Sequence, residues 1–412
     1  MKILHTSDWH LGSQICGRKR YEEHEQFLSW LLSLMNREGV DVLIVAGDIF
    51  DTTTPPNRSL EQYYQFLARA STSSCRHIVI TAGNHDSPSL IAAPRELCKY
   101  LNITVIGSAP KKPEEMVLVF NDQDGMPELI VCPVPYLRDR DVRTTQAGES
   151  PEEKTANLLA GIKAQYHAIG RCAEMMREKI GPIPIIATGH LFAAGGMTRE
   201  DDGSRNLYLG TLACVGADAF PPCIDYLALG HLHLPQRVCG SDRIRYSGAP
   251  LGMGFGEAGQ TKSVLMLDVH DSRTMSIREI PVPVFHRLSR IAGTLDEVMH
   301  NLDCMKTESV PVLVEVLLQD SQKIPDAHER FQSFCEGTRV EVLRVRPYRL
   351  PGQVLHPSHP EESLAELSPE DVFMRRMDAA QITGDDRDEL LASFREIYRL
   401  VLEEDMTAEY QR

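Results

Sequence analysis

The first 280 residues alternate between short apolar runs and longer amphipathic stretches. In residues 22–37 and 60–68, apolar side chains recur every three or four positions, which places them on one face of a helix. Residues 152–179 form a longer, more polar stretch that also favours a helix. The apolar runs are short and rich in Ile, Val, Leu and Ala, as expected for buried strands. They span residues 2–6, 42–46, 77–82, 183–188 and 226–229.

This alternation predicts an α/β fold in which helices cover a sheet. A further apolar run at residues 129–132 adds a strand. Residues 244–246 and 263–267 also have strand character, and the turn-forming Gly248-Ala249-Pro250 lies between them. We therefore expect a β-hairpin-like region there.

The pattern changes after Pro281, where strand and helix signals alternate in a shorter unit. Strands are expected at 282–291, 310–318 and 339–345, with helices at 295–302 and 327–335. We therefore expect a first domain over residues 1–280 and a small α/β domain over 281–346. A segment rich in Pro, Gly and Ser predicts a linker at 347–367. Ser368-Pro369 then opens C-terminal helices over 368–412, whose apolar face either folds back or docks a partner.

Each of the five strands in the first domain runs directly into a short polar motif. The carboxyl ends of parallel strands meet at one edge of a sheet, and ligands of open α/β sheets bind there, so the motifs predict one shared pocket. In chain order they are Asp8-Trp9-His10, Gly47-Asp48-Ile49-Phe50-Asp51, Gly83-Asn84-His85-Asp86, Gly189-His190 and Gly230-His231-Leu232-His233.

The side chains in these motifs are carboxylates, imidazoles and an amide, which are ligands for divalent metal ions. Two sites can be assembled, because the two oxygens of one carboxylate can bridge two ions. The ligand set lacks thiolates, suits Mn²⁺ and also accommodates Zn²⁺ or Fe²⁺. Two divalent ions outweigh the two carboxylates, so the pocket stays positive and suits an anionic phosphate ester. The first site would use Asp8, His10, Asp48 and His233, and the second Asp48, Asn84, His190 and His231.

Three more side chains in these motifs have expected roles outside coordination. His85 is expected to act as a general acid toward the departing oxygen or to bind phosphate. Asp51 is placed to orient His85 and keep it protonated. Asp86 is expected to be a turn or capping residue.

The composition limits the compartment and the partners. The 412 residues contain no apolar run long enough for a membrane span, and the N-terminus begins with a strand pattern instead of a secretory signal. The ten cysteines are scattered without Cys-x-x-Cys pairs, so we expect a cytoplasmic protein. The net charge of −15 does not favour binding to DNA by electrostatics alone. Bound metal ions or a partner would have to supply the positive charge.

The five motifs resemble the pattern of the calcineurin-like metallophosphoesterase superfamily: D-x-H, G-D-x-x-D, G-N-H-D/E, G-H and G-H-x-H. Their flanking residues narrow the resemblance to the nuclease subunits of bacterial SbcCD complexes. The resemblance covers most of the chain, and in that family the small second domain is a capping domain. The flanking segments are His5-Thr6-Ser7-Asp8-Trp9-His10-Leu11-Gly12, Ala46-Gly47-Asp48-Ile49-Phe50-Asp51 and Ala228-Leu229-Gly230-His231-Leu232-His233.

The resemblance implies a two-sheet β core flanked by helices, a pair of Mn²⁺ ions and hydrolysis of DNA phosphodiesters. The implied activities are a double-strand exonuclease and a single-strand and hairpin endonuclease, in DNA repair, recombination and replication at the nucleoid. The implied partner is an SbcC-type coiled-coil ATPase that docks on the C-terminal helices. A homodimer formed through residues 60–68 and 90–101 would complete a heterotetramer.

Two other functions stay open. The sequence also contains two groups of basic residues that are candidates for DNA contacts. A small-molecule metallophosphatase or phosphodiesterase would need the same metal site. A non-catalytic scaffold that recruits an ATPase would not need two cations, so the complete ligand set argues against it. The basic candidates are Arg18, Lys19 and Arg20, and a second group diluted by aspartates, Arg138, Arg140 and Arg143.

Overall fold

The computed structural model describes most of the first 348 residues and a few positions near the C-terminus. The described ranges are 1–143, 148–196, 214–270, 274–319 and 326–348, followed by residues 373, 374, 376, 377, 387, 390, 391, 393 and 394. The chain divides into two units, Met1–Tyr348 and Arg349–Arg412. Most of the predicted linker and of the predicted C-terminal helices lies outside the described residues.

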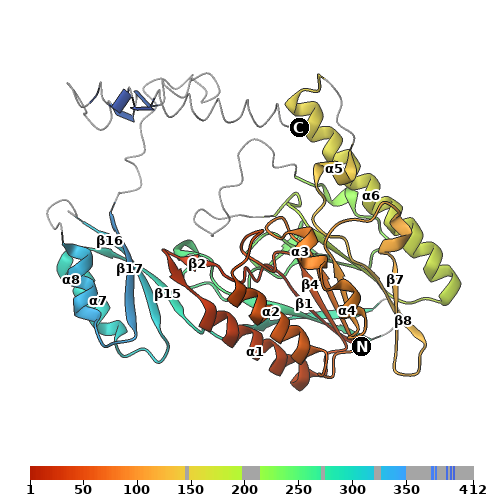
Figure 1. Ribbon diagram of the computed structural model, residues 1–412, viewed down its shortest axis with the longest axis horizontal. Helices are drawn as coiled ribbons and strands as arrows, with labels where there is room; N and C mark the ends of the chain where they lie inside the picture. Colours follow the sequence, from red (N-terminus) through yellow and green to blue (C-terminus); the bar gives the residue numbers. More distant parts are fainter. Residues whose placement is uncertain are drawn as a thin grey trace. The chain divides into compact units, whose positions relative to one another are not determined.

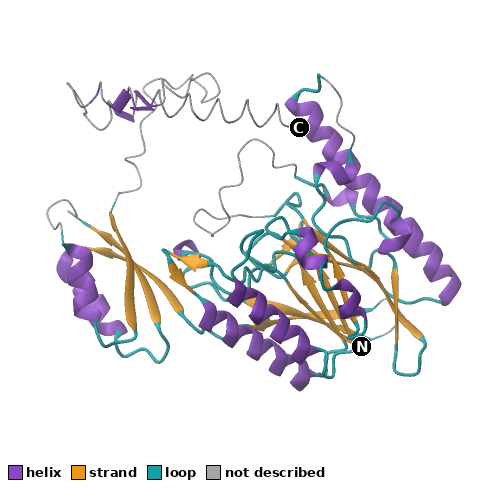
Figure 2. Ribbon diagram, viewed as in Figure 1, coloured by secondary structure: helices purple, strands orange, loops and turns teal. Residues whose placement is uncertain are grey.

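The first unit contains two six-stranded sheets, which run through the centre of Figures 1 and 2. In the first sheet, neighbouring strands β1, β4, β5 and β6 are parallel, and β13 and β14 extend it in antiparallel pairing. Its order is β14 (Met275–Pro281), β13 (Ser263–Val269), β1 (Lys2–Thr6), β4 (Val42–Ala46), β5 (His77–Thr81) and β6 (Ile103–Ile106).

In the second sheet, β8, β9, β10 and β12 are parallel, and an antiparallel strand closes each edge. Its order is β11 (Gln236–Val238), β12 (Ser241–Tyr246), β10 (Tyr226–Gly230), β9 (Ile185–His190), β8 (Pro127–Cys132) and β7 (Leu118–Asn121). The prediction of a β-hairpin-like region across residues 244–270 is wrong. The strand β12 belongs to this sheet, whereas β13 belongs to the first, so the turn-rich segment between them crosses from one sheet to the other.

Helices pack on the outer faces of the two sheets. Apolar residues of α1 and α2 share one buried cluster with the first sheet, and apolar residues of α6 share another with the second. The helix α6 begins with a capping box, in which Ser150 accepts a hydrogen bond from the Glu153 amide. The helices are α1 (Tyr21–Glu38), α2 (Asn57–Ala70), α3 (Pro88–Ala92), α4 (Arg95–Lys99), α5 (Asp139–Val142), α6 (Pro151–Ile180), α7 (Leu295–Met305) and α8 (Ala327–Cys335), with short 3-10 turns η1 (Pro113–Met116), η2 (Ala217–Ala219) and η3 (Phe255–Glu257).

Side chains on one face of each strand fill the space between the two sheets, and those on the other face pack under the helices. In β1, Ile3 points into the cluster shared by both sheets, while the next residue, Leu4, points to the cluster under α1 and α2. Tyr226 and Ile186 meet Ile3 from the second sheet. The expected two-sheet core flanked by helices is confirmed.

A third sheet lies in the region expected to form the small domain (Figure 1). Its three parallel strands are β15 (Arg287–Gly293), β16 (Val312–Leu318) and β17 (Val340–Pro347), with β16 in the middle. The helices α7 and α8 pack on one face through Val298, Leu302 and Phe331. The expected order of strands and helices is confirmed, whereas the domain boundary at residue 280 stays a prediction. A two-stranded hairpin, β2 (Gln14–Ile15) and β3 (Arg18–Lys19), lies beside this sheet.

Among the described residues, no helix has both the length and the apolar character that crossing a lipid bilayer requires.

Candidate metal centre

The polar motifs stand at the carboxyl ends of strands in both sheets. Asp8 and His10 follow β1, Asp48 follows β4, and Asn84 and His85 follow β5. In the second sheet, His190 ends β9, and His231 and His233 follow β10. These strands are neighbours within their sheets, so the carboxyl edges of the two sheets supply all the predicted ligands.

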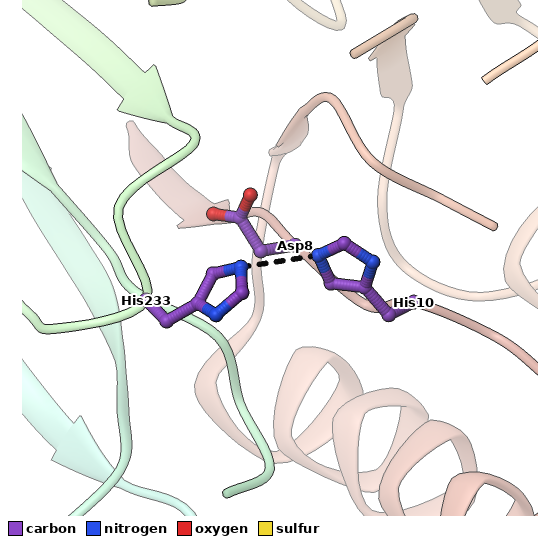
Figure 3. A group of neighbouring side chains, drawn as sticks. All are labelled: Asp8, His10 and His233. Carbon is purple, nitrogen blue, oxygen red and sulfur yellow. Dashed lines mark hydrogen bonds between the residues drawn. The ribbon is translucent and has the colours of Figure 1, made fainter. Parts of the chain in front are cut away.

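One group of side chains gathers around Asp8. Asp8, His10 and His233 each place a ligand atom within 4.8 Å of the other two, and all three are buried (Figure 3). The Nε2 atoms of His10 and His233 face each other at 3.2 Å. Two nitrogens this close require a proton or a cation between them. Asp8 is fixed by a hydrogen bond from the Ser7 hydroxyl and by the backbone amide of His231.

A second group gathers around Asp48. Asp8, Asp48 and His190 place ligand atoms within 4.8 Å of one another. Asp48 Oδ2 lies 3.2 Å from His190 Nε2 and 3.7 Å from His10 Nε2, so one carboxylate stands between the two groups. The Asn84 side-chain oxygen lies 2.9 Å from His190 Nε2 and 3.1 Å from His231 Nδ1. All seven predicted ligands are therefore brought together.

The ring of His190 is oriented by a backbone oxygen on the side away from Asp48. Its Nδ1 lies 3.0 Å from the carbonyl oxygen of Ala46, which accepts a hydrogen bond when Nδ1 carries the proton. That tautomer leaves Nε2 free to face Asp48 and Asn84. A carbonyl acceptor on the outer nitrogen is the usual arrangement for a metal-binding histidine.

His85 and Asp51 lie at the edge of the site, in an arrangement that differs from the expected one. His85 Nδ1 lies 2.8 Å from the backbone oxygen of Asp51. The Asp51 carboxylate lies 3.4 Å from His10 Nδ1. The oxygen at hydrogen-bond distance from His85 is thus a backbone one, and the Asp51 side chain faces a predicted metal ligand.

Asp86 is a structural anchor, as expected. Its buried carboxylate accepts hydrogen bonds from the backbone amides of Ile49, Phe50 and Gly83, at 3.1, 2.9 and 2.8 Å. These bonds tie the loop after β5 to the loop after β4. Burial and the nearby charge of Asp48 raise the pKa of Asp86 to about 6.

The glycines that precede the ligands permit the two sheets to approach. A Cβ on Gly230 would lie 2.0 Å from the Ala46 oxygen and 2.8 Å from His190 Nδ1. A Cβ on Gly47 would lie 2.3 Å from the same nitrogen, and one on Gly83 would lie 2.1 Å from Asp48 Oδ1. Any larger residue at these positions would push the ligands apart.

Backbone strain is concentrated at the predicted ligands. Asp8, His10, Asp48 and His231 have φ angles of 54°, 46°, 49° and 101°. Residues other than glycine rarely adopt positive φ, and such strain is common at functional sites. In the described part of the chain only three other non-glycine residues share this property. The turns that aim these side chains inward are held by the surrounding fold.

The electrostatics of the site favour positive charge. Burial alone would lower the pKa of His190, but the Asp48 carboxylate raises it to about 9. Burial alone would raise the pKa of Asp48, but His190, His10 and His85 hold it below its ordinary value. Burial and the neighbouring His190 lower the pKa of His231 to about 3, so that ring is neutral. A divalent cation can replace the proton on His190, and the set of carboxylate, imidazole and amide donors fits such an ion.

The basic residues of the first predicted DNA-contact group have different environments. The Arg20 side chain is fully buried, pairs with Glu23 at 2.7 Å and donates to the Gly252 oxygen at 2.8 Å. The prediction that Arg20 contacts DNA is therefore wrong, because its guanidinium is sequestered inside the protein. Arg18 pairs with Glu341 at 2.5 Å, and Lys19 is exposed.

The second basic group is also engaged. Arg143 pairs with Asp139 at 3.0 Å and Glu149 at 2.8 Å, and Arg140 lies 3.9 Å from Asp141. Arg138 donates to the backbone oxygen of Asp86 at 3.3 Å. The two close pairs of Arg143 do not favour a phosphate contact there, whereas the Arg140 side chain is 74% exposed and stays a candidate.

Two supporting residues were not identified from the sequence. Ser7 donates to Asp8, and Ser247 lies 2.8 Å from the Ser7 hydroxyl. The position of Ser7 directly before Asp8 could have suggested the first contact. Ser247 is 240 residues away, and no local pattern connects it to Asp8.

Comparisons with known proteins agree with this geometry. Residues 1–235 match the family model for calcineurin-like phosphoesterases, and residues 284–381 match the model named Type 5 capsule protein repressor C-terminal domain. An Escherichia coli K12 protein described as a subunit of the nuclease SbcCD is 37% identical over 379 residues, with 92% of each chain covered. The chain belongs to the SbcD family of nuclease subunits, within the calcineurin-like phosphoesterases.

Other members of the family are also similar over most of their length. The Rhodobacter capsulatus protein of the same description is 35% identical, with 74% of this chain and 75% of that protein covered. The Bacillus subtilis protein is 30% identical, with 80% and 82% covered. The predicted family and fold are confirmed, and the small-molecule phosphatase is not favoured. Membership of the phosphoesterase family implies a divalent metal site, in agreement with the side-chain groups described above.

Replacement of Gly230 by alanine tests the close approach of the sheets. We expect Gly230→Ala to lower the affinity for Mn²⁺ about 10- to 100-fold, as loss of a supporting contact around a metal ligand does, because the new methyl group displaces His190. Isothermal titration calorimetry measures the affinity. The control is Gly125→Ala, where an added Cβ meets no atom within 4 Å. The control should cost about 1–2 kcal/mol of stability through its positive φ and leave metal affinity unchanged. Equal affinities for Gly230→Ala and the wild type would contradict the argument.

Proposed function

We propose that this chain binds two divalent cations, with Mn²⁺ as the working ion, and hydrolyses DNA phosphodiesters as the nuclease subunit of an SbcCD-type complex. One observation carries the proposal: the Asp48 carboxylate stands between His10 and His190, at 3.7 and 3.2 Å, with the other predicted ligands on either side. A carboxylate in this position can bridge two ions. Asp8, His10, Asp48 and His233 would hold the first ion, and Asp48, Asn84, His190 and His231 would hold the second.

When bound, such a pair of ions supplies a nucleophile at neutral pH and stabilises the attacking and leaving oxygens of an in-line displacement. The protein contributes the geometry and the remaining proton transfer. His85 is the general acid toward the leaving oxygen, since its Nδ1 is fixed by the Asp51 carbonyl and Nε2 remains for the substrate. Asp51 positions His10 through its carboxylate, so that His10 Nε2 faces the metal centre.

The description of the relatives supports a nucleic-acid substrate for this chain and its assembly into an SbcCD-type complex. The Escherichia coli protein is described as a nuclease and as a subunit of SbcCD, and it aligns with nearly the whole of this chain. We therefore assign to this chain the double-strand exonuclease and single-strand or hairpin endonuclease activities expected from the sequence. The reaction takes place in the cytoplasm, at the nucleoid, where the substrate is.

An exposed apolar surface supports the proposed homodimer. Leu97 and Tyr100 of the α4 region are 66% and 89% exposed, and Tyr64 of α2 is 39% exposed. Large apolar side chains gathered at the surface are typical of protein interfaces. The surface lies in the segments expected to pair two nuclease subunits.

The C-terminal unit supports the proposed ATPase contact. The nine described residues between 373 and 394 are helical, and the rings of Phe373 and Phe394 stack with centroids 4.3 Å apart. Two helical segments therefore pack against each other within this unit, which leaves further apolar positions such as Leu390 exposed. We propose that these helices dock at the base of the SbcC-type coiled coil.

A cleavage assay tests the function directly. We expect the purified chain, with Mn²⁺ and with or without the ATPase, to shorten an end-labelled blunt duplex, whereas p-nitrophenyl phosphate is turned over poorly. The description of the relatives as nucleases favours a nucleic-acid diester, and the phosphomonoester is the control. Rapid hydrolysis of the monoester without duplex shortening would instead favour the phosphatase function.

Removal of the imidazole at position 85 separates chemistry from metal binding. We expect His85→Ala to lower kcat for duplex cleavage about 10²- to 10⁴-fold, the usual contribution of a general acid. Elemental analysis should still find two ions per chain, because His85 is not a ligand. The control is His270→Ala, which removes an exposed histidine outside the site. Full activity of His85→Ala would exclude that residue from the mechanism.

Deletion of residues 368–412 tests the ATPase contact. We expect the truncated chain to lose copurification with the ATPase, since the docking helices are gone. It should keep Mn²⁺-dependent hydrolysis of bis(p-nitrophenyl) phosphate, because all predicted ligands lie in the first unit. Unchanged copurification after deletion would refute the docking role.

A further inference from the structure

Three arginines surround one glutamate on the small three-stranded sheet. In the strand register, Glu315 of β16 lies directly between Arg290 of β15 and Arg344 of β17. Arg290 Nε is 2.6 Å from the Glu315 carboxylate, and Arg344 also forms an ion pair with it. Arg346 Nε lies 3.9 Å away. Glu315 itself is completely buried beneath these side chains.

These charges lie on the face of the sheet that is not covered by helices. Along β16, Val314 and Val316 pack into the cluster formed with α7 and α8, so Leu313 and Glu315 point to the opposite face. On that opposite face, Leu313 and Leu288 pack against Ile15 of β2 and Phe255 of η3. Glu315 lies two residues after Leu313 on the same face, so the arginine cluster begins next to this contact.

The balance of charge in this cluster is the reverse of that around several other arginines of the protein. Arg76 lies between two carboxylates, and so do Arg177 and Arg278. Around Glu315, by contrast, Arg344 and Arg346 depend on one carboxylate, which Arg290 also contacts. Among the described residues, Glu315 is the one carboxylate within ion-pair distance of Arg344 and Arg346. The surface thus carries excess positive charge on a chain whose net charge is −15.

The cluster adjoins the loops that leave the candidate metal centre. Ile15 lies five residues after His10, in the hairpin that follows the first motif. Phe255 lies in the segment after β12, which begins at Ser247 beside Ser7, the residue that donates to Asp8. The Arg344 guanidinium is 6.0 Å from the Phe255 ring. The ion pair between Arg18 and Glu341 joins the same hairpin to β17. An extended anion bound at the metal centre could therefore continue onto this face of the sheet.

We propose that Arg344 and Arg346 contact the phosphate backbone of the nucleic acid, with Glu315 holding their guanidinium groups in place. Guanidinium groups bind phosphate oxygens in a bidentate manner, and such contacts position a duplex without reading its sequence. This surface supplies positive charge that the chain as a whole lacks. The inference rests on the function proposed above, because it names where the substrate of that site continues.

A matched pair of substitutions tests the surface. Arg346 and Arg287 have side chains of similar exposure, 49% and 46%, in the same small sheet. Arg287 pairs with Glu308 and has no part in the proposed contact. Removing either arginine changes the net charge by the same amount. Any difference in DNA affinity between the two variants must therefore come from where the arginine lies on the small sheet.

The measurement is fluorescence anisotropy of a labelled blunt duplex bound by the full-length chain in EDTA, over a range of salt concentrations. We expect Arg346→Ala to weaken binding about fivefold and to lower the slope of log affinity against log salt by about one, the effect of losing one phosphate contact. Arg344→Ala should act similarly, Arg346→Lys should restore most of the slope, and Arg287→Ala should bind as the wild type does. Thermal unfolding of each variant verifies folding.

Hydrolysis of bis(p-nitrophenyl) phosphate with Mn²⁺ separates this inference from the proposed function. That small diester reaches the metal centre alone, so Arg346→Ala should hydrolyse it at the wild-type rate. Loss of this hydrolysis in Arg346→Ala, or equal duplex affinities for Arg346→Ala and Arg287→Ala, would overturn the phosphate surface. Loss of ATPase copurification with unchanged duplex affinity would overturn it too and assign the arginines to a protein partner. A wild-type chain that binds the duplex but never cleaves it would refute the nuclease proposal and leave the arginine surface standing.

Discussion

The candidate metal centre depends on the close approach of two β-sheets at their carboxyl edges. The ligands come from β1, β4 and β5 in one sheet and from β9 and β10 in the other. They can meet only where the chains carry no side-chain bulk, and at Gly230 even a methyl group would overlap the Ala46 carbonyl oxygen. The same oxygen is the hydrogen-bond partner of His190. The packing of the sheets and the orientation of His190 therefore both depend on the Ala46 carbonyl oxygen. The apolar layer between the sheets keeps them at this distance.

The charge at the candidate metal centre differs from that of the chain as a whole. The chain is strongly acidic overall, but Asp8 and Asp48 face buried imidazoles that can take up cations. Asp48 raises the pKa of His190 because a negative charge in a buried site is stabilised by any neighbouring positive charge. That property makes the site receptive to a divalent ion. It also reconciles an acidic chain with an anionic substrate, since the positive charge is local.

The small sheet is joined to the core by contacts that the basic residues of the first hairpin help to form. Arg20 forms a buried ion pair with Glu23 and binds the Gly252 carbonyl, and Arg18 pairs with Glu341 of the small sheet. A run of basic residues in a sequence suggests a nucleic-acid contact, but here two of its three members form ion pairs within the protein. The arginines of β17, which no sequence pattern singled out, have the excess charge instead.

Much of this protein was determined by local sequence. Apolar runs of four to six residues, each followed by Asp, Asn or His, predicted the five strands, their shared edge and the meeting of seven candidate ligands. The reason is that strand direction fixes where the following residues emerge. Long-range packing decided the rest. The assignment of β12 and β13 to different sheets, the burial of Arg20, the turn of the Asp51 carboxylate toward His10 and the gathering of arginines around Glu315 all depend on partners distant in sequence. Hydrophobic periodicity is a local property, whereas the partner of a charged or polar side chain is chosen by the three-dimensional fold.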